Sequence, residues 1–181
     1  MPVTIEGPLL QGVSAFAFAT MLALACVADL RTRRIPNALV LVTFALGMAQ
    51  SIVHFGVWQG GGRAVAGMLT GLAIWLPFWL LRMMGGGDVK LFAAGAAWLG
   101  VSGAVEGALL AGLCGGVLSL AYMLYQHGLS YTIVRVSHGM QQPSTLREAS
   151  SAKWSQRMPY ALAMSAGLAL AAWRPGMLQL M

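Results

Sequence analysis

Two aspartates are the residues of this sequence best suited to chemistry. Asp29 and Asp88 are two of only five acidic residues among 181, and each stands at one end of a long apolar stretch. Two facing carboxylates can share one proton, so that the ionised group activates a water and the protonated group donates to a carbonyl oxygen. The pair therefore predicts hydrolysis of the aspartyl-protease type. For either residue alone, a solvated acid at a helix end is the alternative.

The segment MMGGGDVKLF surrounds the second aspartate with unusual residues. Glycine is the poorest helix former after proline, so three in a row between apolar segments need an explanation. Gly85, Gly86 and Gly87 could form a non-helical segment without side chains, which would let a substrate backbone approach Asp88 closely. A flexible turn between two spans explains the three glycines equally well. Lys90 either stabilises a carboxylate or extends toward lipid headgroups.

Other catalytic chemistries find little support. The three histidines are scattered without metal-ligand spacing, and Cys26 and Cys114 lie in separate apolar segments with no CxxC pair. These patterns favour neither a zinc site nor a disulfide framework, and no serine-histidine-acid constellation is present. We therefore expect no metal and no other cofactor.

Composition places these residues in a membrane. The chain is 58% hydrophobic and only 9% charged, whereas soluble domains carry roughly a quarter charged residues. Its net charge of +6 does not indicate nucleic-acid binding, because the basic residues flank apolar stretches and form no recognisable nucleic-acid module. A soluble domain is excluded, and an all-α polytopic membrane protein is predicted.

Hydropathy and length predict about six transmembrane helices. They are Leu9–Ala28, Ala38–Val57, Ala64–Leu81, Val89–Val105, Gly107–Gln126 and Tyr160–Trp173. The glycine spacing in GMLTG (residues 67–71) and in GALLAG (residues 107–112) permits close helix contact.

The basic residues predict the orientation. The first, third and fifth loops hold nine of the eleven lysines and arginines, whereas the second loop and the tail hold only Arg63 and Arg174. By the positive-inside rule, the odd-numbered loops are cytoplasmic and both termini lie outside the cytoplasm. Asp29 and Asp88 then lie together at the cytoplasmic edge of the membrane.

We expect a single membrane-embedded domain over residues 1–181 with one long cytoplasmic loop, residues 127–158. Thr145 and Glu148 have the spacing of a capping box, and Trp154 follows as a membrane-interface anchor. A short interfacial helix is one interpretation of this loop, and a flexible polar loop is the other.

The sequence resembles the type IV prepilin leader peptidases, and within them the short Tad/Flp-type branch. The motifs that carry the resemblance are DLRTRRIPN (residues 29–37) and GGGDVKL (residues 85–91), which contains the family's G-x-G-D pattern. MPYALAMSAG (residues 158–167) is a weaker match. The similarity covers nearly the whole chain in order.

The resemblance implies a six-helix aspartyl protease of the bacterial inner membrane, with Asp29 and Asp88 as its catalytic pair. Such enzymes cut the leader from prepilins or pseudopilins at the cytoplasmic face, typically after a glycine. The expected partners are this substrate, with its hydrophobic N-terminal helix, and the lipid bilayer, with no nucleic acid.

Several further residues follow the family's motifs. Arg34, Pro36 and Asn37 either contact substrate or shape the start of the second span, where proline fixes the backbone and asparagine can bond the first turn. Pro159 and Tyr160 match the start of the family's last span. Longer members carry a cytoplasmic insert with paired CxxC motifs and also N-methylate the product; here Asp29 follows the first span directly, so we expect peptidase activity without methyltransferase activity.

Two other functions stay open on the residues alone. A small proton-coupled transporter also uses paired membrane acids, although its acids belong near the midplane. A non-catalytic assembly subunit of a secretion system would need neither aspartate. A presenilin-like protease shares G-x-G-D, but its tyrosine-aspartate motif is absent, since Ala28 precedes Asp29.

Overall fold

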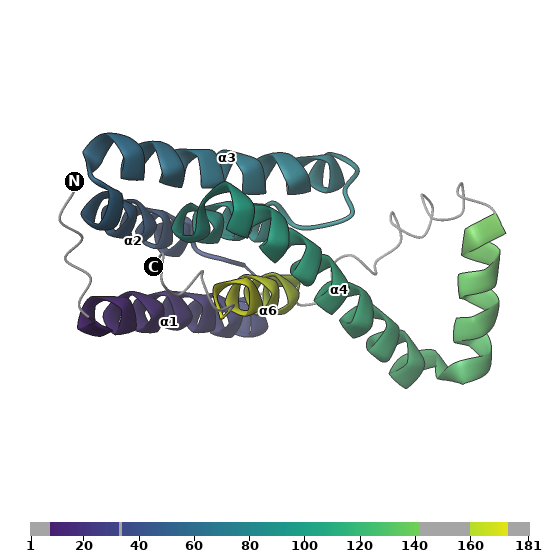
Figure 1. Cartoon of the computed structure of the whole chain (residues 1–181). Helices are drawn as coiled ribbons and strands as arrows, with labels where there is room; N and C mark the ends of the chain where they lie inside the picture. The colour runs from purple at the N-terminus through teal and green to yellow at the C-terminus, as the bar shows by residue number, and fades with distance from the viewer. Residues whose placement is uncertain (1–7, 33, 142–159, 174–181) are drawn as a thin grey trace.

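The computed structural model describes residues 8–32, 34–141 and 160–173, and the regular structure within these ranges is entirely helical. Its helices pack as a bundle from which one long helix extends (Figure 1). In chain order they are α1 (Pro8–Thr32), α2 (Asn37–Phe55), α3 (Val57–Leu80), α4 (Gly86–Gln141) and α6 (Tyr160–Ala172). The predicted loop helix near Trp154 lies outside the described residues.

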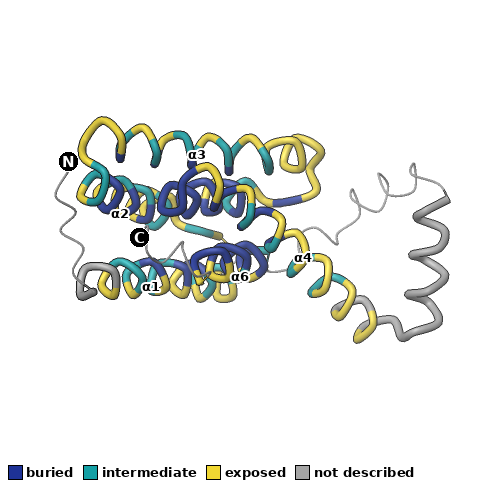
Figure 2. The backbone as a smooth tube through the Cα atoms, in the orientation of Figure 1, coloured by how far each residue is buried: buried dark blue, intermediate teal, exposed yellow. Residues whose placement is uncertain are grey.

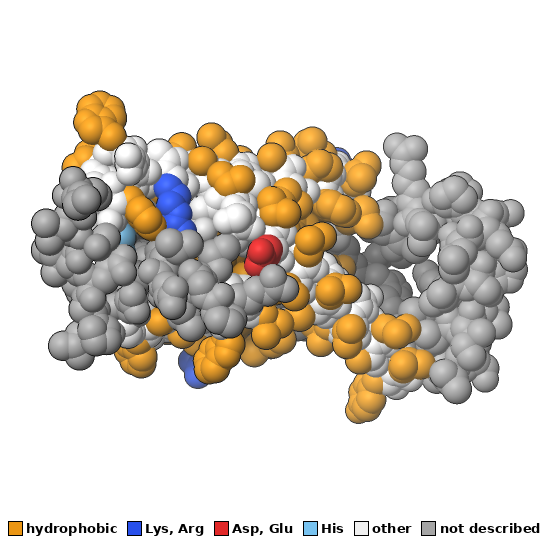
Figure 3. Space-filling view, viewed as in Figure 1, with side chains coloured by type: hydrophobic (Ala, Val, Ile, Leu, Met, Phe, Trp, Pro, Cys, Tyr) orange, Lys and Arg blue, Asp and Glu red, His pale blue; other side chains and the backbone are white. Residues whose placement is uncertain are grey.

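The helices have the surface of a membrane protein. Each of α1 to α4 contains a stretch long and apolar enough to cross a membrane, and α6 is a shorter apolar helix. Large apolar side chains are exposed over much of the surface (Figure 3). Phe16, Leu69 and Leu109, for example, are all more than half exposed. The prediction of an all-α polytopic membrane protein is confirmed.

The first part of α4 forms the core of the bundle. Residues 91–100 are all buried, whereas later residues of the same helix are mostly exposed (Figure 2). Trp98 packs its ring 5.1 Å from that of Phe18 in α1, and its indole N–H donates to the Thr43 carbonyl of α2 at 2.9 Å. Because this part of α4 is held by contacts on several sides, the position of its first turn is also fixed.

Small residues let α3 approach α4 closely. The buried face of α3 consists of Gly60, Ala64, Gly67 and Gly71. A Cβ atom on Gly67 would lie 2.5 Å from the Ala96 carbonyl oxygen, so no larger side chain fits there. The close contact expected of GMLTG is confirmed. In GALLAG, a Cβ on Gly107 would lie 3.4 Å from Leu168 of α6, whereas one on Gly112 would have no neighbouring atom within 4 Å.

The helix α4 folds back on itself at Gly100. The φ angle of this residue is +73°, which lies outside the helical range. A Cβ atom on Gly95 would lie 3.5 Å from Leu168 Cδ2, and one on Gly107 would lie 3.4 Å from the same atom. Twelve residues of straight helix span about 18 Å, so the two glycines can share this neighbour only if the chain reverses between them.

Arg63 supports this reversal. Its Nη2 donates to the Leu99 carbonyl at 3.1 Å, and its guanidinium lies 4.4 Å from the centroid of the Phe55 ring. A break in a helix leaves carbonyl groups without their usual helical partners, and this arginine provides a donor for one of them. Its predicted place in the second loop is wrong, because α3 begins at Val57 and therefore includes it.

The other span boundaries differ from the prediction in three places. The connection between α2 and α3 shortens to Gly56, whose φ of +80° permits a tight turn, so residues 57–63 become helical. The predicted break between residues 105 and 107 lies instead at Gly100, and the helix continues past Gln126 to Gln141.

The end of α3 contains a strained residue whose replacement we expect to stabilise the protein. Arg82 has φ +59°, and the N–H groups of Arg82 and Met83 donate to the carbonyls of Trp79 and Phe78, both at 2.9 Å. This is a Schellman motif with arginine where glycine is usual. Arg82→Gly should raise the free energy of unfolding by about 1 kcal/mol, because glycine adopts positive φ without steric cost.

Thermal unfolding in detergent micelles measures this effect. Arg82→Ala is the matched control, since it removes the same charge but keeps a Cβ atom. If the glycine and alanine variants unfold at the same temperature, the steric explanation is wrong.

Candidate active site

Four helix ends meet at one pole of the bundle. Asp29 lies in the last turn of α1, and Asp88 lies in the first turn of α4. The chain between α1 and α2 and the chain between α3 and α4 close the same region. These segments surround a cavity of about 380 Å³ whose lining includes both aspartates.

The two carboxylates form a pair within this cavity. They lie close enough for their charges to interact. Asp88 is only 9% exposed and Asp29 is half-buried. Two carboxylates in one poorly solvated cavity are the arrangement that a shared proton requires. The geometry suits acid–base chemistry by the pair.

The glycines keep the face of Asp88 open. A Cβ on Gly85 would lie 3.0 Å from Asp88 Oδ2, and one on Gly86 would lie 2.9 Å from Trp79 Nε1. Side chains at these positions would crowd the carboxylate or displace the indole. Gly86 and Gly87 are wound into the first turn of α4, so the non-helical backbone expected for the whole glycine run is confined to Gly85.

Three predicted polar residues reach the cavity. Arg34, Asn37 and Lys90 all line it, so the cavity combines two carboxyl groups with two cationic side chains and one amide. Arg34 and Lys90 are exposed and provide positive charge at the rim. Asn37 is the first residue of α2, and the N-cap position before it is occupied by Pro36.

The remaining predicted residues have other positions. Pro36 precedes α2, and its carbonyl accepts from the N–H of Leu39 at 3.0 Å, which is a structural role. Tyr160 begins α6, is half-buried, and lies within electrostatic range of Asp88. Pro159 lies outside the described residues.

Two residues at the site were missed by sequence reasoning. Ile35 lines the cavity, and a Cβ on Gly87 would lie 3.6 Å from Ile35 Cβ. Trp79 of α3 covers Gly86. Both are apolar side chains in an apolar chain, so residue type gave no indication of their position. The only sequence signals near them were the IPN segment, which contains Ile35, and the GGGD segment, which follows Trp79 along the chain.

In the part of the chain that the structure describes, no three His, Cys, Asp or Glu side chains converge as a metal site. The functional groups that the cavity does provide are the two carboxylates, the flanking cations, the amide and the exposed backbone of the glycines.

Comparison with known proteins identifies the family. The model of the type IV leader peptidase family matches residues 16–120, more than half of the chain and a range that includes both aspartates. No solved structure gives a significant match.

Several curated proteins, each named prepilin leader peptidase/N-methyltransferase, are similar to this chain. The protein of Xanthomonas campestris pv. campestris is 30% identical over 62% of the chain and 41% of its own length. That of Burkholderia pseudomallei is 29% identical over 65% and 40%, and that of Dickeya chrysanthemi is 34% identical over 70% and 42%. The matches thus span about two fifths of these relatives. On the strength of the family match, the chain belongs to the type IV leader peptidase family.

Proposed function

We propose that this protein is an aspartic endopeptidase of the bacterial inner membrane that removes the leader from prepilin-like proteins. The observation that carries the proposal is the meeting of Asp29 and Asp88, from two separate motifs, in one cavity. Family membership supports the substrate class, because the similar proteins are named for cleavage of prepilin leaders.

The carboxylate pair begins with one shared proton. The ionised carboxylate takes a proton from water as the water oxygen attacks the scissile carbonyl carbon, and the protonated carboxyl donates its proton to the carbonyl oxygen. As the tetrahedral intermediate collapses, the C–N bond breaks, the leaving nitrogen takes a proton from one carboxyl of the pair, and a hydroxyl of the intermediate returns its proton to the other carboxylate. One proton again remains between Asp29 and Asp88.

The surrounding residues serve this reaction by position. Gly85 leaves room for an extended substrate backbone beside Asp88, because a side chain there would crowd the carboxylate. Lys90 and Arg34 place positive charge at the rim of the cavity. Tyr160, at the start of α6, lies within electrostatic range of Asp88.

The site faces the cytoplasm in this proposal. Arg31, Arg34, Arg82 and Lys90 all belong to the pole that holds the two aspartates, and such an excess of cations favours the cytoplasmic side. If the two arms of α4 around Gly100 each cross the bilayer, the helices make six crossings and both termini lie outside the cytoplasm.

The substrate of this proposal is a prepilin or pseudopilin of the Tad/Flp type, cut after a glycine and not methylated afterwards. The only cysteines are Cys26 and Cys114, which lie in α1 and α4, so the CxxC pairs typical of the methylating members are missing. Asp29 also follows the apolar part of α1 without an intervening insert.

Co-expression with a Flp-like prepilin tests cleavage and methylation together. We expect the intact mass of the product to equal that of the mature pilin with an unmodified N-terminus. The Xanthomonas campestris relative, expressed with its own prepilin, is the positive control for methylation. Absence of cleavage would contradict the proposed peptidase, and a methylated product from the purified protein would contradict the second half of the proposal.

A further inference from the structure

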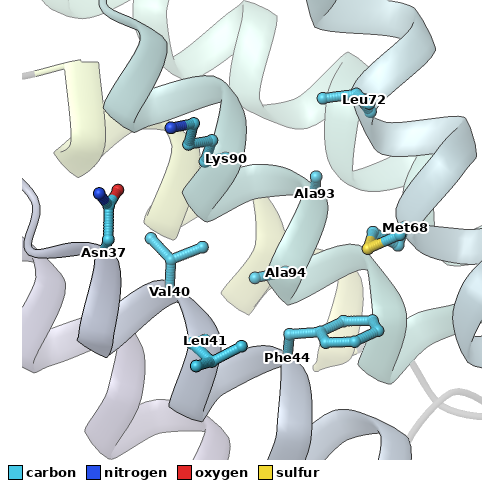
Figure 4. A pocket seen from close by; sticks show the side chains of 9 residues that line it. All are labelled: Asn37, Val40, Leu41, Phe44, Met68, Leu72, Lys90, Ala93 and Ala94. Atoms are coloured by element: carbon cyan, nitrogen blue, oxygen red, sulfur yellow. The ribbon is translucent and has the colours of Figure 1, made fainter.

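A second cavity of about 290 Å³ lies between α2, α3 and α4 (Figure 4). Its walls are apolar: α2 contributes Val40, Leu41 and Phe44, and α3 contributes Met68 and Leu72. Ala93 and Ala94 of α4 form its floor, and their small side chains leave the space open. The mechanism proposed above does not use this cavity.

The second cavity adjoins the site of the aspartates. Asn37 and Lys90 line both cavities. In Figure 4 these two polar side chains lie at one end, and Phe44 and Met68 lie at the other. The polar end of the apolar cavity is therefore the end nearest the carboxylates.

The cavity extends away from the pole that holds the aspartates. Phe44 lies seven residues along α2 from Asn37, or about 10 Å of helix. Met68 lies twelve residues before the end of α3 at Leu80, or about 18 Å. Since the aspartates lie at the helix ends, the far end of the cavity lies at the depth of the hydrocarbon core. Any part of a substrate that reaches this end of the cavity is therefore itself in the membrane.

We propose that this cavity is a specificity subsite for an apolar side chain of the substrate on the carboxyl side of the scissile bond. The proposal rests on the proposed function. A leader is the N-terminal piece of its precursor and leaves from the polar end, so the retained chain is the piece that continues into the membrane. A volume of about 290 Å³ is at the lower limit of ligand pockets, and suits one or two side chains rather than a whole helix.

Paired changes in enzyme and substrate test the subsite. The substrates are model prepilins in which each of the first few residues after the cut is, in turn, alanine, leucine or tryptophan. Phe44→Ala enlarges the deep end of the cavity, so at one of these positions it should raise the kcat/KM of the tryptophan substrate relative to leucine by roughly 10-fold. Met68→Ala should also shift the preference between the tryptophan and leucine substrates, and at the same substrate position.

Leu46→Ala is the matched control. Leu46 lies on the same helix as Phe44 and is partly exposed, but it does not line the cavity. It should keep the wild-type preference at every position. Met68→Ala provides an independent test if Phe44→Ala fails to accumulate.

The outcomes separate this proposal from the proposed function. Normal wild-type cleavage, with unchanged preferences in both cavity variants, would overturn the subsite and leave the peptidase standing. An equal loss of rate for all substrates would also overturn it, because a cavity filled by a lipid chain would behave in that way. Absence of cleavage by the wild-type protein would overturn the peptidase, and the subsite with it.

Discussion

Replacement of either aspartate by asparagine should abolish prepilin cleavage, with a fall in rate of about 10³-fold or more. Asparagine has nearly the shape of aspartate, so Asp29→Asn and Asp88→Asn keep the cavity. They remove the carboxyl group that takes up and releases the proton. Because the two carboxylates interact within one cavity, loss of either one disables both halves of the acid–base cycle. Immunoblots of prepilin processing in membranes, followed by rates from purified protein, measure the effect.

The acid Glu106 provides the matched control. It lies on α4 with Asp88 but beyond the reversal at Gly100 and outside the cavity, so Glu106→Gln should process prepilin at close to the wild-type rate. All variants must accumulate to similar levels. Full processing by Asp29→Asn or Asp88→Asn would remove that residue from the mechanism, and would favour the transporter or the assembly subunit instead.

The proximity of the two aspartates could be predicted because the chain has so few charges. Acids are expensive beside hydrocarbon, so Asp29 and Asp88 had to stand at span ends, and the count of spans put both ends on one side. The order of the helices along the chain is enough to place both aspartates at one pole of the bundle. How the helices pack against one another does not have to be known.

The helix boundaries that were predicted wrongly depend on contacts between distant residues. The segment from Val57 to Arg63, with three glycines, has poor helix propensity and looks like a loop. It is helical because Gly60 packs directly on the Ser51 backbone and Arg63 bonds to the Leu99 carbonyl. The reversal at Gly100 is equally tertiary in origin, since several other glycines of α4 remain within the helix.

The apolar subsite could not be predicted for a different reason. Phe44 and Met68 are ordinary apolar residues of a chain that is 58% hydrophobic, and neither their type nor their spacing sets them apart. Only the small side chains of Ala93 and Ala94, opposite them across the cavity, distinguish this face from a filled contact between helices. Such a gap exists only once three helices have been placed.

Substitution at Gly67 should strongly destabilise the protein. A Cβ there would lie 2.5 Å from the Ala96 carbonyl oxygen and 2.9 Å from Gly100 Cα, and both are backbone atoms that cannot rotate aside. Gly67→Val therefore forces α3 and α4 apart, and should cost about 3 kcal/mol or more of unfolding free energy. Thermal unfolding in detergent and the steady-state level in membranes both measure the loss.

Gly62→Val is the control for Gly67→Val, because it places the same residue in the same helix. A Cβ on Gly62 would meet nothing within 4 Å, so this variant should fold and process prepilin normally. The comparison separates the intrinsic helix propensity of valine from the contact between helices.

Because α3 leads through residues 81–85 into the first turn of α4, separation of the two helices also displaces Asp88 from Asp29. Any Gly67→Val protein that accumulates should thus have lost cleavage as well as stability; a stable, fully active Gly67→Val would mean that α3 and α4 do not pack at this distance.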